Sequence, residues 1–225
     1  SVRLMGLSSI MGAINVIVTI INMRTPEMSL LKMPMFVWTW LITAYLLIAV
    51  MPVLAGAVTM LLTDQFFGTS FFLAAGGGDP VLFQHVFWFF GHPEVYIVAL
   101  PAFGVISDLV AVHARKNIFG YRMMVWAILA IGVISFVVWA HHMYVSGMNP
   151  YFGFFFATTT LIIAIPTALK VYNWVLTLWR GNIHLTVPML FVIGFIFTFV
   201  NGGITGLFLG NVAVDMPLSD SYFIV

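Results

Sequence analysis

The stretch WFFGHPEVYIVALP, residues 88–101, places a histidine, a glutamate and a tyrosine inside an otherwise apolar run. The run extends over about residues 81–107, and about 20 apolar residues are enough for a helix to cross a membrane. Polar groups cost free energy at that depth and usually mark functional sites. Tyr96 follows His92 by four residues and shares its helix face, whereas Glu94 points elsewhere. The stretch therefore predicts a membrane helix that carries a functional site.

The composition extends this interpretation to the whole chain. Of the 225 residues, 62% are hydrophobic and 7% are charged, and the mean hydropathy is +1.11. A soluble domain needs more polar surface than this. Apolar runs lie near residues 4–23, 35–62, 81–107, 121–147, 152–178 and 187–211. We expect an all-α bundle of six spanning helices, with residues 1–225 in a single membrane domain and no nucleic-acid partner.

Charge alternates between the connections of these runs. The first, third and fifth connections are basic and carry Arg24, Lys32, Arg115, Lys116, Arg122 and Arg180. The others carry Asp64, Asp79, Asp215 and Asp220. Because basic loops stay on the cytoplasmic or matrix side, the odd-numbered loops are predicted to lie there, with Arg3 as the exception.

Three histidines are predicted to meet near the outer side. The sequence has no cysteine, so a metal would need imidazole or oxygen ligands. At 1.5 Å per residue, His92 lies roughly 16 Å below the outer surface, and His141 and His142 lie roughly 8–9 Å below it. Uncertainty of a few residues at the helix ends makes these depths compatible. A thiolate-free imidazole set favours copper or zinc over iron.

Each polar residue also has a plainer interpretation. A single membrane histidine is more often a hydrogen-bond partner between helices than a ligand. Zinc would indicate hydrolysis or transport, whereas copper would indicate electron or oxygen chemistry, which the nearby phenol of Tyr96 favours. Glu94 could hold and release a proton in a relay. Lys170 is the only Lys or Arg deep within an apolar run and lies inward of Tyr96, although it could also snorkel or neutralise a helix end.

Four motifs in order carry a family resemblance: WFFGHPEVYI (88–97), VWAHHMYVSGM (138–148), IIAIPTALKVYNW (162–174) and GFIFTFVNGGITG (194–206). The chain resembles subunit I of the heme-copper terminal oxidases, of the cytochrome c oxidase type, from its fourth transmembrane helix to the start of its tenth. The chain would then be a fragment of a longer polypeptide. The resemblance implies reduction of dioxygen to water with coupled proton pumping.

The resemblance also implies roles for the residues already singled out. His92, His141 and His142 would bind copper, and Trp88 would pack beside that site. Tyr96 would be cross-linked to His92 and would supply an electron and a proton.

Two proton paths follow from the resemblance. Lys170, Thr167 and Ser107 match the path that leads to the tyrosine. Glu94 matches the branch-point carboxyl of the other path.

Other cofactors are implied less directly. Two hemes are expected, but their axial ligands would lie outside residues 1–225. Asp215 and Asp220 match the polar region above the heme propionates, where the family places magnesium. Ser219 stands where the family usually has a histidine, and a hydroxyl is a weaker magnesium ligand.

The resemblance also implies partner subunits and an electron donor, and two other functions remain as alternatives. The resemblance implies oxidase subunits II and III, membrane lipid, and cytochrome c or a quinol as electron donor. The location would be a bacterial plasma membrane or the mitochondrial inner membrane. One alternative is a nitric oxide reductase, which the tyrosine disfavours. Another is a proton-coupled transporter in which histidine and lysine form a relay without a metal.

Overall fold

The computed structural model describes residues 2–224. All of its regular elements in that range are helices. Its main helices are α1 (Val2–Asn22), α2 (Met35–Phe66), α3 (Pro80–Ala114), α4 (Tyr121–Ile134), α5 (Pro150–Leu178) and α6 (Val187–Leu209), followed by the short α7 (Val212–Leu218). Within residues 2–224, six helical segments are long and apolar enough to cross a membrane. The prediction of an all-α protein with six spans is therefore confirmed.

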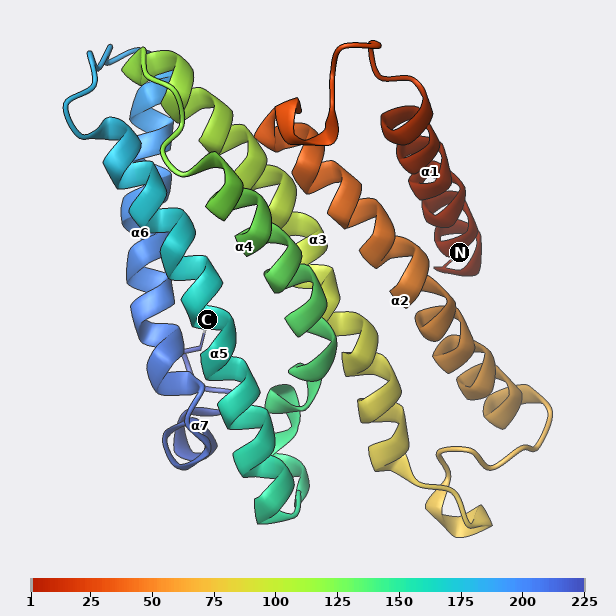
Figure 1. Ribbon diagram of the computed structural model, residues 1–225. Helices are drawn as coiled ribbons and strands as arrows, with labels where there is room; N and C mark the ends of the chain where they lie inside the picture. The colour runs from red at the N-terminus through yellow and green to blue at the C-terminus, as the bar shows by residue number, and fades with distance from the viewer. Residues whose placement is uncertain (1, 225) are drawn as a thin grey trace.

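Helix α3 lies at the centre of the bundle (Figure 1). It packs most extensively on α2 and also contacts α4, α5 and α6, whereas α1 lies against the far side of α2. The largest buried cluster joins α2, α3, α4, α5 and α6 and includes Leu100, Val110, Ile128, Trp174 and Met189. Side chains on α3 are thus held by neighbours on several sides.

Helices α3 and α5 both begin with an Asp or Asn side chain that caps the helix, followed by a proline. The Asp79 side chain accepts a hydrogen bond from the backbone N–H of Val81 at the start of α3, and Pro80 occupies the first turn. At the start of α5, Asn149 accepts from the N–H of Tyr151. Asp and Asn satisfy otherwise free N–H groups, and proline at the first helical position loses no hydrogen bond.

The fourth spanning segment differs from the predicted continuous helix over 121–147. Helix α4 ends at Ile134, and the chain continues as two 3-10 segments, η3 (Ser135–Val137) and η4 (Trp139–Ser146). Val138 between them has φ −120° and ψ −2°, and the Ser135 hydroxyl donates to the carbonyl of Gly132. The Ser135 hydroxyl competes with backbone N–H groups for this carbonyl near the end of α4. Such competition favours the end of the α-helical hydrogen-bond pattern. His141 and His142 therefore lie on a 3-10 turn.

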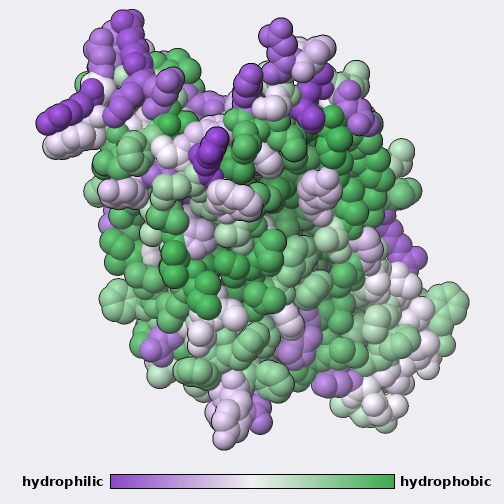
Figure 2. Space-filling model, viewed as in Figure 1, coloured by the Kyte–Doolittle hydropathy of each residue, from purple (hydrophilic) through white to green (hydrophobic). Residues whose placement is uncertain are grey.

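Hydrophilic residues gather at one end of the molecule, over the basic connections (upper end of Figures 1 and 2). Arg24 donates to the carbonyl of Ile20, and the Lys116 ammonium donates to the carbonyls of Leu176 and Trp179. These cations satisfy carbonyls at helix C-termini, where the helix dipole favours positive charge. Basic and acidic connections thus lie at opposite ends, as predicted, and their assignment to compartments stays a prediction.

Candidate metal centre

His92 projects from the middle of α3 and is 5% exposed. The helix continues through Pro93, which follows it. Gly91 precedes it, and a Cβ atom there would lie 2.7 Å from the Trp88 ring. A side chain at position 91 would displace that indole, so the glycine allows Trp88 to approach the backbone beside His92.

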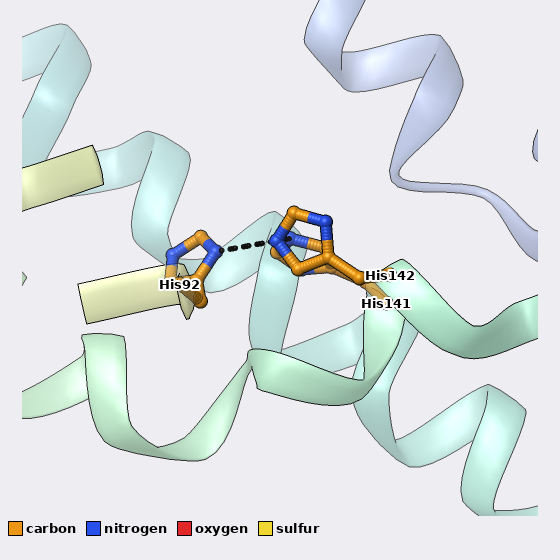
Figure 3. Close-up of side chains that lie close together, drawn as sticks. All are labelled: His92, His141 and His142. Atoms are coloured by element: carbon orange, nitrogen blue, oxygen red, sulfur yellow. Dashed lines mark hydrogen bonds between the residues drawn. The ribbon is translucent and has the colours of Figure 1, made fainter. Parts of the chain in front are cut away.

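Three imidazole rings meet between α3 and η4 (Figure 3). His92 Nδ1 lies 3.3 Å from His142 Nε2. His141 Nε2 lies 3.1 Å from that same His142 atom. One nitrogen of each ring falls within 4.8 Å of the other two. The histidines predicted to meet are therefore brought together.

The nitrogen geometry fits a metal ion. Ligands that each lie about 2.0 Å from one ion are at most about 4 Å apart, and about 3.3 Å apart at a tetrahedral angle. The 3.1 and 3.3 Å separations match that range. Three imidazoles without thiolate form a donor set that copper or zinc prefers. The cluster supports the predicted copper, since its nitrogen atoms converge from two separate elements.

The two adjacent histidines are held by different neighbours. His142 stacks on Trp88, with ring centroids 4.0 Å apart and planes 9° from parallel, so Trp88 lies beside the site as predicted. His141 Nδ1 lies 2.8 Å from the Thr160 hydroxyl on α5. Thr160 was missed by the sequence reasoning. Its spacing of seven and ten residues from Thr167 and Lys170, on one helix face, was the available signal.

Tyr96 packs against His92 from one turn later on α3. The ring centroids are 4.7 Å apart, with planes at 58°. His92 Nε2, the nitrogen turned away from the other histidines, is buried and has no hydrogen-bond partner among the described residues. The predicted one-turn relation between the two residues is therefore confirmed as a ring contact, while the predicted covalent bond stays a prediction.

Lys170 is fully buried on α5. Its ammonium lies 5.1 Å from the centre of the Phe103 ring and 5.9 Å from that of Trp174. Within the described part of the chain, Lys170 Nζ has no hydrogen-bond partner. Aromatic faces attract a cation at these distances. The lysine is therefore held in the membrane by aromatic rings.

The two hydroxyls predicted on the lysine path point to other groups. The Ser107 hydroxyl donates to the carbonyl of Phe103 and accepts from Trp174 Nε1. Thr167 donates to the carbonyl of Ile163. Trp174 contacts both Ser107 and the lysine cation, so it joins two of the predicted path residues. Direct bonds from the hydroxyls to Lys170 are absent from the described residues.

Glu94 lies on a different face from the histidine cluster. It is exposed on the surface of this chain, whereas His92 is buried. Residues two apart on a helix are rotated by about 200° around its axis, so they lie on nearly opposite faces. Its predicted separation from the metal site agrees with this placement.

The aspartates near the end of the chain, Asp215 and Asp220, do not join the histidine cluster. Asp215 is on α7, and Asp220 follows it with a left-handed φ of 59°. Partial burial, together with the charge of Asp220, raises the pKa of Asp215. In the described residues, the only group of three candidate ligands is the histidine triad. With Ser219 in the histidine position, the residues present do not form a magnesium site by themselves.

Known proteins match the sequence of this chain. The family described as "Cytochrome C and Quinol oxidase polypeptide I" matches residues 1–225. An alternative cytochrome c oxidase subunit 1 of Bradyrhizobium diazoefficiens is 66% identical over 96% of this chain and 38% of its own length. A cytochrome c oxidase subunit 1 of Cereibacter sphaeroides is 53% identical over 100% of this chain and 40% of its own length. The chain thus spans about two fifths of these curated relatives. Because the family match covers all of residues 1–225 and both relatives are highly similar in sequence, the chain belongs to the family of cytochrome c and quinol oxidase polypeptide I.

Proposed function

We propose that this chain forms the copper-binding part of the catalytic subunit of a terminal respiratory oxidase. The enzyme reduces dioxygen to water and couples that reaction to proton pumping. The observation that carries the proposal is the convergence of three imidazole nitrogens within 4.8 Å, next to a tyrosine ring. Both relatives described above are named as subunit 1 of a cytochrome c oxidase.

His92, His141 and His142 hold copper through the three nitrogens that face one another. When bound, copper and the neighbouring heme supply electrons to dioxygen. The family implies two hemes, with axial ligands outside residues 1–225. The contact of Tyr96 with His92 favours copper over zinc, because a phenol beside the site can supply an electron and a proton. It also favours an oxidase over a metal-free transporter or a nitric oxide reductase.

Two side chains move protons in this proposal. Lys170 takes up a proton from the inner side and passes it toward Tyr96, with Thr167 and Ser107 along the route. A buried amine that neighbouring rings stabilise as a cation can both gain and release a proton. Glu94, on a separate face of α3, serves the second route. Asp215 contributes to the polar outer region above the heme propionates.

The complete enzyme would contain subunits II and III and would accept electrons from cytochrome c or a quinol. The test is to purify the complex from its membrane, measure copper and the heme spectrum, and record oxygen consumption with each donor. Copper, heme and oxygen uptake with either donor support the proposal. A preparation without copper and heme that transports protons with a solute would contradict it.

The Glu94→Gln variant should lose most turnover and proton pumping while retaining copper and heme. The amide keeps the size of the side chain but cannot release a proton, and a positioned proton-transfer group contributes about 100-fold or more. The measurement is oxygen consumption together with acidification outside reconstituted vesicles. Glu27→Gln, at the loop between α1 and α2, is a matched control. Unchanged pumping in the Glu94 variant would assign this carboxyl a structural role.

His92 and Tyr96 are expected to be joined covalently. A buried N–H without an acceptor costs about 1–3 kcal/mol, and a bond from His92 Nε2 to the tyrosine ring removes that group. Formation of this N–C bond releases two protons and two electrons, which dioxygen, the proposed substrate, accepts. Mass spectrometry of the peptide spanning 88–100 should give a mass lower by two hydrogens, with no fragments from cleavage between the joined residues. A linear peptide from an active preparation would disprove the link.

A further inference from the structure

The Thr160 hydroxyl is bonded on two sides. It lies 2.6 Å from the carbonyl oxygen of Phe156, one turn earlier on α5, and 2.8 Å from His141 Nδ1. A threonine hydroxyl has one hydrogen, and a carbonyl oxygen can only accept. The short contact with Phe156 therefore takes the hydroxyl hydrogen.

The contact between Thr160 and His141 determines which ring nitrogen of His141 carries the hydrogen. Because its own hydrogen is used, Thr160 Oγ1 is an acceptor toward His141, and Nδ1 must carry the ring hydrogen. In a neutral imidazole the other nitrogen is then bare. That nitrogen, Nε2, lies 3.1 Å from His142 Nε2 and belongs to the converging set (Figure 3).

We infer that Thr160 is a positioning residue that fixes the tautomer and orientation of His141 for copper, an inference that rests on the proposed function. The backbone of α5 strengthens this arrangement, because the Phe156 carbonyl prevents the hydroxyl from rotating to donate to the histidine. His141 is thus held through α5, a helix that supplies no ligand of its own. Groups that orient a ligating histidine in this way typically change metal affinity by about 10–100-fold.

The experiment compares Thr160→Val with Thr160→Ser in the complete oxidase. Valine keeps the branched shape and removes the hydroxyl, whereas serine keeps the hydroxyl and removes the methyl group. Copper per heme is measured before and during incubation with a copper chelator. The valine variant should lose copper about 10–100-fold faster than the wild type, and the serine variant should retain it.

Thr158→Val is the matched control. The Thr158 hydroxyl also donates to a carbonyl four residues earlier, that of Phe154, but it is exposed and does not contact a histidine. This variant should retain copper as the wild type does. Equal copper loss in Thr158→Val, loss in Thr160→Ser, or full retention in Thr160→Val would each overturn the role of the Thr160 hydroxyl. A wild-type complex without copper would instead contradict the proposed function.

Discussion

Replacement of His142 by asparagine should remove most of the bound copper. His142 Nε2 is the nitrogen that lies close to both other imidazoles, at 3.1 and 3.3 Å. Asparagine is shorter and offers an amide oxygen, which suits copper poorly. Only two convergent nitrogens would remain. Metal analysis of the purified complex, expressed as copper per heme, measures the loss.

The same variant should still insert and fold. His142 is exposed in this chain, and its main contact is the stack on Trp88, so its replacement leaves the large buried cluster unchanged. His113→Asn is a suitable control, because His113 lies in the last turn of α3 and bonds Thr186 at the other end of the bundle. Full copper occupancy in His142→Asn would show that the triad does not bind copper as proposed.

Lys170→Met should slow reduction of the active site before oxygen binds by about 100-fold or more, the usual contribution of a positioned proton-transfer group. Methionine keeps an unbranched apolar stem between Phe103 and Trp174 but carries no proton. Copper content should stay normal, because the lysine ammonium lies over the Phe103 and Trp174 rings and has no hydrogen bond to a histidine in the described residues. Rapid mixing of the oxidised complex with a reductant, followed by the heme spectrum, measures this rate.

Lys32→Met provides the comparison, since Lys32 is an exposed lysine in the connection between α1 and α2. Its replacement removes one positive charge without affecting the buried aromatic contacts. Reduction at the wild-type rate in Lys170→Met would make this lysine structural. Protons for Tyr96 would then have to pass through Glu94.

Most helix positions were predictable because membrane helices are defined by apolar length. The end of α3 was not: the apolar run stops near residue 107, but the helix continues to Ala114. Asp108 interrupts the run, yet its carboxylate accepts hydrogen bonds from the backbone N–H groups of Met35 and Phe36 at the start of α2. Such a charge is satisfied by tertiary contact, which a sequence pattern does not reveal. Likewise, apolar residues alone do not distinguish α from 3-10 geometry over 135–146.

The convergence of the three histidines was predictable, but the groups that hold their rings in place were less so. Depth and residue type were enough to bring His92, His141 and His142 together. The spacing of Thr160 from Thr167 and Lys170 places it on their helix face but does not indicate a histidine partner, because threonines on membrane helices commonly bond only their own backbone. Its second contact depends on how α5 packs against η4. The aromatic rings around Lys170 likewise depend on the packing of α3 against α5.

The separation of 50 residues between His92 and His142 has a consequence for biosynthesis. At about 5–20 residues per second, synthesis of the intervening chain takes roughly 3–10 seconds. In the later part of that interval α3, which ends at Ala114, is complete, whereas η4 has not yet been fully synthesised. A newly made chain therefore cannot bring the three proposed copper ligands together until η4 has been made and has packed against α3. If the triad binds copper as proposed, metal loading follows the association of α3 with η4, and a chain stalled before residue 142 lacks one of the three ligands.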